Sequence, residues 1–207
     1  MSATMPLVSP IGEQPVVVSP DAIWRFSVEH YHAMIHAGIL TADDPVELLE
    51  GWLVTNMPKN PRHSVVTQLV RDTLAHILSS GWYVNTQEPI TTTDSEPEPD
   101  VAVVRGNRRQ YLDHHPGPHD VALVVEVADS SLQRDRSLKK RLYAAAGIPV
   151  YWLVNLIDGQ LEVYTDPSGP AEQPDYRQQR NYSPADIVPV VIEAREVGRI
   201  TVRDLLP

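Results

Sequence analysis

Two short apolar runs, each carrying one carboxylate, constrain the fold of this chain more than any other feature. The first run places Asp100 directly before Val101 to Val104, and the second extends from Val121 to Val127 with Glu126 inside it. Both runs have the length and the valine content of buried strands. Because an unpaired carboxylate is costly to bury, the two acids require a partner.

The polar loop at residues 105–120 lets the two runs pair as antiparallel neighbours. In that pairing Asp100 lies opposite Glu126, and the period-two alternation of side chains places both carboxylates on one face of the sheet. Two carboxylates about 4 Å apart repel each other by roughly 4 kcal/mol at an effective dielectric constant near 20. The sequence therefore predicts that a cation or a shared proton offsets this repulsion.

The composition is that of a globular protein of 207 residues, with 42% hydrophobic residues and no run long enough to cross a membrane. We expect an extended, proline-rich arm over residues 1–20 and a single domain over residues 21–207. The chain has no cysteine, which excludes disulfides, thiolate metal sites and cysteine nucleophiles. Together with the absence of a secretion signal, this favours a cytoplasmic location.

The formal net charge of −10 argues against non-specific binding to nucleic acid, which depends on phosphate neutralisation by Lys and Arg. Two basic groups nevertheless flank the acidic pair in the sequence. They are Arg105, Arg108 and Arg109 in the loop, and Arg134, Arg136, Lys139, Lys140 and Arg141 in the following helix. They could form a basic rim, but a solvated charged helix face is the favoured interpretation for most of them.

Periodicity and helix-breaking residues predict an α/β fold with the order helix, three strands, helix, strand, strand. The predicted helices cover residues 22–37, 62–80 and 132–146, and the predicted strands cover 45–56 as a strand or hairpin, 82–90, 98–104, 121–127, 150–154 and 161–164. The apolar stripe of the second helix is predicted at Val65, Leu69, Leu74, Ile77 and Leu78. We expect residues 167–184 to form a long surface loop and residues 187–206 to form short edge strands.

Lys139 borders the apolar stripe of the predicted helix 132–146. A lysine held in a partly apolar site beside carboxylates can keep its charge and position a water or an anion. The alternative is an i,i+4 ion pair with Asp135, worth only tenths of a kcal/mol, and this is the favoured interpretation of Lys139 taken alone. Asp100 has an alternative too, as an acid that caps a turn at the strand entrance.

Histidines supply a second candidate metal site. His32 and His36 are four residues apart in the first predicted helix, a spacing that can bring two imidazoles to one metal. Because no third ligand is evident, surface histidines are the favoured interpretation. Three histidines of the 105–120 loop, at His114, His115 and His119, could chelate zinc, but a flexible polar loop is favoured there.

In combination, these motifs resemble those of the Uma family of "putative restriction endonucleases", which looks like a branch of the PD-(D/E)XK nuclease superfamily. The resemblance rests on Glu98-Pro99-Asp100-Val101, Leu123 to Val127, Arg134-Asp135 with Lys139, Leu142 to Gly147, and Tyr151 to Val154, with Val46 to Gly51 and Pro61 to His63 as N-terminal motifs. It covers the chain from about Phe26 to the C-terminus. It implies a restriction-endonuclease-like core, with a central mixed β-sheet flanked by helices.

The resemblance also implies roles for individual residues. Asp100 and Glu126 would be the metal-binding acids, and the backbone carbonyl of Val127 would be a further ligand. Glu47 would add an acid from the preceding segment, and His63 would lie close by. These five residues are the predicted metal and proton-transfer groups.

One departure from the superfamily pattern concerns the lysine. The usual motif places it two residues after the second acid, where this chain has Ala128. The resemblance implies that Lys139 takes its place from the helix. It further implies hydrolysis of phosphodiester bonds in duplex DNA with Mg²⁺ or Mn²⁺. A homodimer is expected, because cutting both strands calls for two active sites.

Two other functions stay open on the sequence alone. The first is a nuclease-fold protein without cleavage activity that serves as a binding or assembly module. The second is a metal-dependent hydrolase of a small phosphorylated substrate, which the acidic net charge would suit better than DNA.

Overall fold

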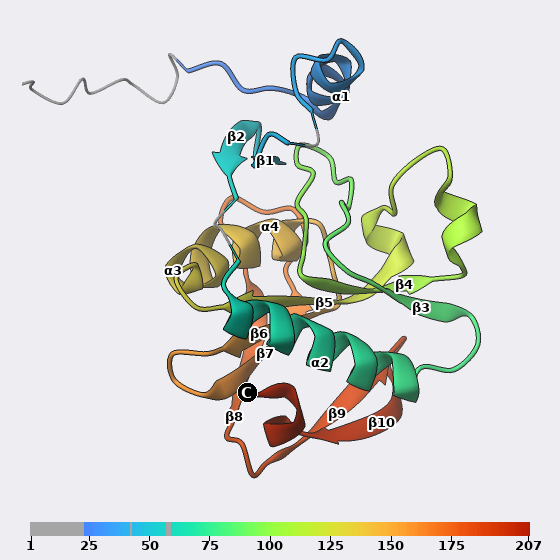
Figure 1. The fold of residues 1–207 in the computed structure, drawn as a ribbon, viewed down its shortest axis with the longest axis vertical. Coiled ribbons are helices and arrows are strands. Elements are labelled where there is room, and N and C mark those ends of the chain that lie inside the picture. Colours follow the sequence, from blue (N-terminus) through green and yellow to red (C-terminus); the bar gives the residue numbers. More distant parts are fainter. Residues whose placement is uncertain (1–22, 42, 57–58) are drawn as a thin grey trace, which may run out of the picture.

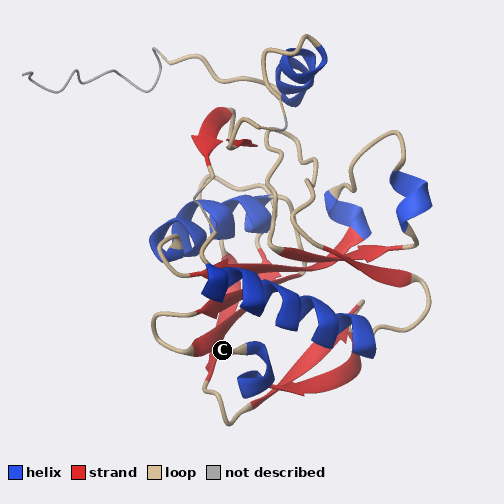
Figure 2. Cartoon of the chain, viewed as in Figure 1, coloured by secondary structure: helices blue, strands red, loops and turns tan. Residues whose placement is uncertain are grey.

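A six-stranded mixed β-sheet lies at the centre of the computed structural model, which describes residues 23–41, 43–56 and 59–207 (Figures 1 and 2). Its strands, in spatial order, are β3 (Trp82–Asn85), β4 (Val101–Arg105), β5 (Val121–Ala128), β6 (Val150–Asn155), β7 (Gln160–Pro167) and β8 (Tyr176–Tyr182). Only the β5 and β6 pair is parallel, and every other neighbouring pair is antiparallel. The sheet is flanked by helices, so the predicted fold class is confirmed.

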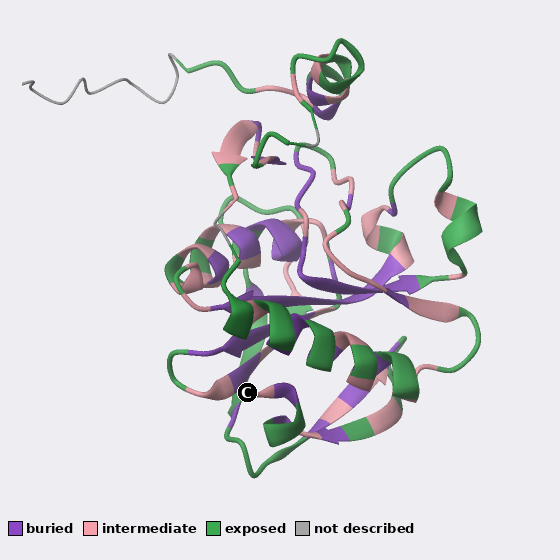
Figure 3. Cartoon of the chain, in the orientation of Figure 1, coloured by how far each residue is buried: buried purple, intermediate pink, exposed green. Residues whose placement is uncertain are grey.

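The remaining elements form a layer on each face of the sheet and a small N-terminal group. They are α1 (Val28–His36), the hairpin β1 (Val46–Leu49) and β2 (Trp52–Thr55), α2 (Pro61–Ile77), α3 (Leu132–Arg134), α4 (Lys140–Ala145), and the hairpin β9 (Ile187–Ile192) and β10 (Arg195–Thr201). The helix α2 and the hairpin β9–β10 share one apolar core with the sheet, and α4 packs on the opposite face. Burial therefore concentrates in the middle strands, as Figure 3 shows.

The register of β4 against β5 sets the position of the two acids. Val101 pairs with Val125, so Asp100, one residue earlier, lies opposite Glu126, as predicted. Ala102 of β4 and Val124 of β5 pack into the core on the α4 side. Because side chains alternate along a strand, both carboxylates point to that same side of the sheet.

The first two helices differ from their predicted extents at their ends. The helix α1 begins at Val28 because Ser27 caps it, its side chain accepting a hydrogen bond from the His30 amide. The predicted helix start at residues 19–22 and the predicted arm at 1–20 lie outside the described residues. The helix α2 ends at Ile77 rather than at residue 80.

The buried stripe of α2 agrees with the prediction at Leu74, and Ile77 and Leu78 pack against the core as predicted, but its first half is displaced by one residue. Val66, Val70 and Leu74 are fully buried, whereas Val65 is 54% exposed and Leu69 is also exposed. The sequence carries apolar residues at both offsets, so periodicity alone could not choose between them. The packing of α2 against the sheet determines that Val66 and Val70, and not Val65 and Leu69, are buried.

The last third of the chain departs most from expectation. The predicted loop at 167–184 contains β8, which pairs with β7 although its five central residues are exposed. Backbone pairing at a sheet edge needs no apolar side chain, so polarity was misleading here. Residues 187–206 do not form edge strands of the main sheet; the hairpin β9–β10 is a separate two-stranded sheet packed against its core.

The helix predicted at 132–146 is not a continuous α-helix. A π-helical turn at Asp135–Lys139 separates α3 from α4. The predicted strand 82–90 is also shorter, because β3 ends at Asn85. In the described part of the chain, no helix combines the length and apolarity that crossing a bilayer would require.

Candidate active site

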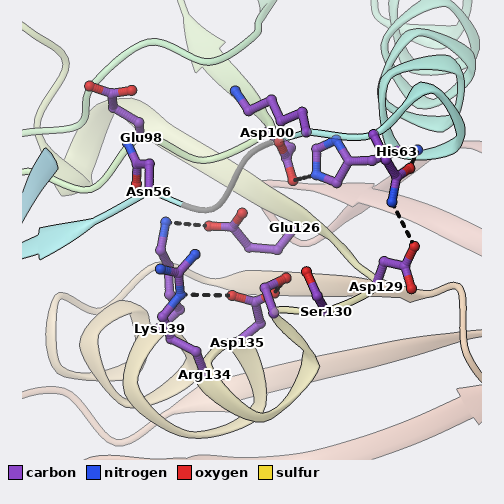
Figure 4. A pocket seen from close by; sticks show the side chains of 13 residues that line it. Asn56, His63, Glu98, Asp100, Glu126, Asp129, Ser130, Arg134, Asp135 and Lys139 are labelled. Carbon is purple, nitrogen blue, oxygen red and sulfur yellow. Dashed lines mark hydrogen bonds and ion pairs between the residues drawn. The ribbon is translucent and has the colours of Figure 1, made fainter. Parts of the chain in front are cut away.

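A polar cavity of about 60 Å³ opens where the segment just before β4, the end of β5, the N-terminus of α2 and the π-helical turn at Asp135–Lys139 meet (Figure 4). Four of the predicted residues line it: His63, Asp100, Glu126 and Lys139. Glu47 lies next to the cavity, fully buried, with its carboxylate on Lys139. The fold thus brings the five predicted side chains together from five separate segments.

Asp100 uses one carboxylate oxygen to bind the protein. Its Oδ2 accepts a hydrogen bond from the Val127 amide at 2.9 Å and lies 3.0 Å from Nε2 of His63. No described residue forms a hydrogen bond with Oδ1. His63 is fixed in the first turn of α2, since its amide donates to the side chain of the capping residue Asn60 at 2.9 Å. The second oxygen of Asp100 is therefore available at the cavity.

Glu126 follows the same pattern. Its Oε1 accepts a hydrogen bond from the Tyr143 hydroxyl at 2.6 Å and lies 3.2 Å from Nζ of Lys139. Its Oε2 has no hydrogen-bond partner among the described residues. Each of the two strand acids thus binds the protein with one oxygen and keeps the other oxygen free.

Lys139 lies between two carboxylates and is buried. Its Nζ donates to Oε2 of Glu47 at 2.9 Å and contacts Glu126. Burial alone would lower the pKa of Lys139, but the Glu126 and Glu47 carboxylates outweigh it and raise that pKa above its ordinary value. The ammonium group therefore stays protonated. The alternative ion pair with Asp135 does not form; the ion-pair partners of Lys139 are Glu47 and Glu126.

Glu47 contributes an acid from the N-terminal hairpin. Its Oε2 also accepts a hydrogen bond from the Glu98 amide at 3.0 Å, while Oε1 is buried with no hydrogen-bond partner among the described residues. A buried oxygen without a partner costs about 1–3 kcal/mol. Such an atom next to an acid cluster is a typical position for a water or a cation.

The π-helical turn places two charged residues at its ends. Asp135 and Lys139 are both buried there. The Tyr151 hydroxyl from β6 donates to the Asp135 carbonyl at 3.1 Å and secures the start of the turn. Because π-helical turns inside α-helices occur frequently at functional sites, this irregularity marks the same region as the acids do.

The pKa of Glu126 is raised to about 8. Burial is the main cause, and the Asp100 and Asp135 carboxylates add to it, against the opposing effects of Lys139 and the Tyr143 hydroxyl. The ordinary value, which applies to the unfolded chain, is 4.5. Between these two values the folded protein retains a proton that the unfolded chain releases.

This shift predicts the pH dependence of stability. Because the folded-state pKa is the higher one, Glu126 favours unfolding increasingly as the pH rises from 4.5 to about 8. We expect the metal-free protein to lose up to about 1.4 kcal/mol per pH unit relative to Glu126→Gln. Urea unfolding of both proteins across this range measures the difference. An unchanged difference between them would contradict the raised pKa.

The residues of the cavity fit a divalent cation. Four buried acids lie in or beside the cavity, and Lys139 contacts two of them, Glu47 and Glu126; the acids are Glu47, Asp100, Glu126 and Asp135. No three His, Asp or Glu side chains in the described ranges converge into a ready-made metal cage. Mg²⁺, however, commonly binds through only one or two carboxylates together with water and substrate phosphate. The free oxygens of Asp100 and Glu126 match that mode.

Some residues of the cavity were not predicted as functional. Asp135 is buried at its wall, and its Oδ2 accepts a hydrogen bond from the Ser131 hydroxyl at 2.6 Å. Asn60 and Asp129 join across the cavity rim through a 2.9 Å hydrogen bond. The position of Asp135, four residues before Lys139, was a signal in the sequence, but nothing local indicated the contact between Asn60 and Asp129.

The predicted basic rim does not form as a whole. Arg105 lies at the far end of β4 from Asp100, so the loop arginines are remote from the cavity. Three of the helix cations are paired elsewhere: Arg136 with Glu162 and Asp158, Lys140 with Asp175, and Arg141 with Glu50. The cavity itself is lined by Lys59, Arg134 and Lys139. Tertiary ion pairs thus neutralise most of the charge that is contiguous in the sequence.

The histidine pair of α1 is engaged in other contacts. Nε2 of His32 lies 2.8 Å from Oε2 of the buried Glu96, and Nδ1 of His36 donates to the His32 carbonyl. His114 and His115 border the same cavity as this pair, and His119 lines a different one. These histidines form no metal-holding group among the described residues.

A mixed sheet with two opposed strand acids and a neighbouring buried lysine places the chain in the class of restriction-endonuclease-like folds. A comparison with family models matches residues 28–201 to Uma2, described as "Putative restriction endonuclease". The chain therefore belongs to the Uma2 family, which confirms the resemblance and supports a nuclease role.

A solved structure has a similar fold. It is described as "a putative nuclease belonging to DUF820" from Anabaena variabilis ATCC 29413. The TM-score is 0.61 at 15% sequence identity, and the match covers 82% of this chain and 94% of the other. This likeness supports the assignment of the fold. No curated protein matches the chain.

Proposed function

We propose that this protein is a metal-dependent endonuclease that hydrolyses phosphodiester bonds of duplex DNA. The observation that carries the proposal is the pair of free carboxylate oxygens on Asp100 and Glu126, which face one cavity beside the buried ammonium group of Lys139. Family membership supports the nuclease chemistry.

Asp100 and Glu126 would hold Mg²⁺ or Mn²⁺, with the Val127 carbonyl as a further ligand and Glu47 as an additional acid. When bound, the ion supplies Lewis acidity and a water of lowered pKa. The amide of Val127 donates a hydrogen bond to Asp100 and fixes the orientation of that carboxylate.

In the proposed reaction, His63 transfers a proton and Lys139 stabilises negative charge. Nε2 of His63 lies 3.0 Å from Oδ2 of Asp100. It is therefore within reach of the proton that the attacking water would release beside Asp100, and we assign His63 as the proton carrier. Lys139 offsets negative charge that develops on the scissile phosphate. The substrate, duplex DNA, follows from the family alone, and a homodimer would supply one such site for each strand.

A cleavage assay tests this function. The wild-type protein is expected to nick or linearise supercoiled plasmid in the presence of Mg²⁺ or Mn²⁺ but not of EDTA, and Asp100→Asn is expected to lose this activity by at least about a hundredfold. Plasmid that stays intact under all metal conditions would contradict the proposal. Retained cleavage by Asp100→Asn would contradict the assigned site.

One observation favours a second function. Because most of the basic side chains near the site are ion-paired and the net charge is −10, a small phosphorylated substrate meets less repulsion than DNA does. Parallel assays with bis(p-nitrophenyl) phosphate and p-nitrophenyl phosphate distinguish the two functions. Hydrolysis of these esters without plasmid cleavage would favour the small-molecule hydrolase.

A further inference from the structure

Tyr143 lies directly behind Glu126 and is completely buried. Its hydroxyl donates to Oε1 of Glu126 at 2.6 Å. Burial raises the pKa of Tyr143 well above its ordinary value, and the Glu126 charge raises it further, so the hydroxyl remains a hydrogen-bond donor. This is a short hydrogen bond between two buried groups, which is strong because no water competes for it.

This hydrogen bond determines which oxygen of Glu126 is free. Tyr143 and Lys139 both contact Oε1, from different segments of the helical region. A carboxylate held by two groups on the same oxygen cannot rotate freely about its last bond. The other oxygen, Oε2, which has no hydrogen-bond partner among the described residues, is thereby held in a fixed orientation in the cavity that Asp100 also lines.

A row of tyrosines holds Tyr143 in turn. Its ring centroid is 5.3 Å from that of Tyr151, and Tyr151 is stacked with both Tyr164 and Tyr176 at 5.5 and 6.2 Å. Tyr151 also donates to the Asp135 carbonyl at the start of the π-helical turn. The row therefore connects the acid on β5 to the turn that delivers Lys139.

We propose that Tyr143 is a positioning residue that orients Glu126 for metal binding. This inference rests on the proposed function, because it assigns the support of the same metal site. Hydrogen-bond partners of metal ligands are general contributors to affinity, and their removal typically costs about 10–100-fold. The prediction is therefore a loss of metal affinity without loss of the fold.

The test compares two conservative variants of the same tyrosine row. Tyr143→Phe removes the hydroxyl from Glu126, whereas Tyr176→Phe removes a buried hydroxyl that donates only to the Ile148 carbonyl at 2.9 Å. In calorimetric titrations with Mn²⁺, Tyr143→Phe is expected to bind about 10–100-fold more weakly than the wild type, and Tyr176→Phe within about twofold of it. Thermal unfolding of the metal-free proteins verifies that both variants are folded.

A tyrosine difference spectrum supplies a second measurement. Adding Mn²⁺ to the wild type and to Tyr176→Phe is expected to change the near-ultraviolet absorption of tyrosine. The reason is that the Tyr143 hydroxyl is hydrogen-bonded to Glu126, so the charge of a bound ion alters its electrostatic environment. The signal is expected to disappear in Tyr143→Phe. If that variant does not fold, the wild-type spectrum decides, and its failure to change at Mn²⁺ saturation overturns the inference.

The outcomes separate this inference from the proposed function. Equal Mn²⁺ affinity of Tyr143→Phe and wild type, with binding lost in Glu126→Gln, overturns the positioning role and leaves the metal site standing. An equal loss in both tyrosine variants also overturns it, because the effect would then be general to the tyrosine row. A wild-type protein that binds no Mn²⁺ overturns both.

Discussion

Replacing Glu126 with glutamine is expected to weaken Mn²⁺ binding by at least about a hundredfold, and Asp100→Asn is expected to do the same. Each substitution keeps the shape of the side chain but removes the negative charge of one of the two acids with a free oxygen. Calorimetric titration measures this directly and needs no knowledge of the DNA sequence recognised. The expected result would establish the acid pair as the metal site.

Glu96→Gln is the matched control for this experiment. Glu96 is also a buried carboxylate, but it faces His32 and Thr91 and does not line the active-site cavity. Its replacement is expected to leave Mn²⁺ affinity unchanged. If Glu96→Gln weakened binding as much as Glu126→Gln, the loss would reflect a general effect of removing a buried acid.

Wild-type protein that binds no Mn²⁺ at millimolar levels would favour the inactive binding module.

The second large effect is expected on stability. Lys139→Met leaves Glu47 and Glu126 buried without their cation, and breaking a buried ion pair from one side typically costs about 3–5 kcal/mol. Urea unfolding of the metal-free protein above pH 8, where Glu126 is ionised, measures the change. The neighbouring Lys140→Met is the control, since it removes a solvent-accessible pair with Asp175, worth about 1 kcal/mol or less.

A double variant separates lost packing from unpaired charge. Adding Glu47→Gln to Lys139→Met removes one of the two stranded carboxylates, so part of the lost stability is expected to return. A double variant that is less stable than Lys139→Met by the full cost of Glu47→Gln alone would show that the two residues act independently. In that case the buried ion pair would not be the source of the destabilisation.

The position of the two strand acids could be predicted from the sequence. Period-two alternation in two valine-rich runs fixed which side chains share a face, and the connecting loop fixed the antiparallel pairing that brings Asp100 opposite Glu126. Helix-breaking residues likewise indicated most of the element order. Each of these patterns is encoded within a short run of the sequence, and so it can be recognised without knowing the rest of the fold.

The surroundings of these acids were decided only by the tertiary structure. Lys139 meets Glu47 across 92 residues of sequence, and distant acids neutralise the cations next to it in the chain. The polar strand β8 forms because β7 offers it backbone partners, and packing against the sheet selects which apolar residues in the first half of α2 are buried. Sequence periodicity defines the faces of an element, but which groups meet those faces depends on how the elements pack in space.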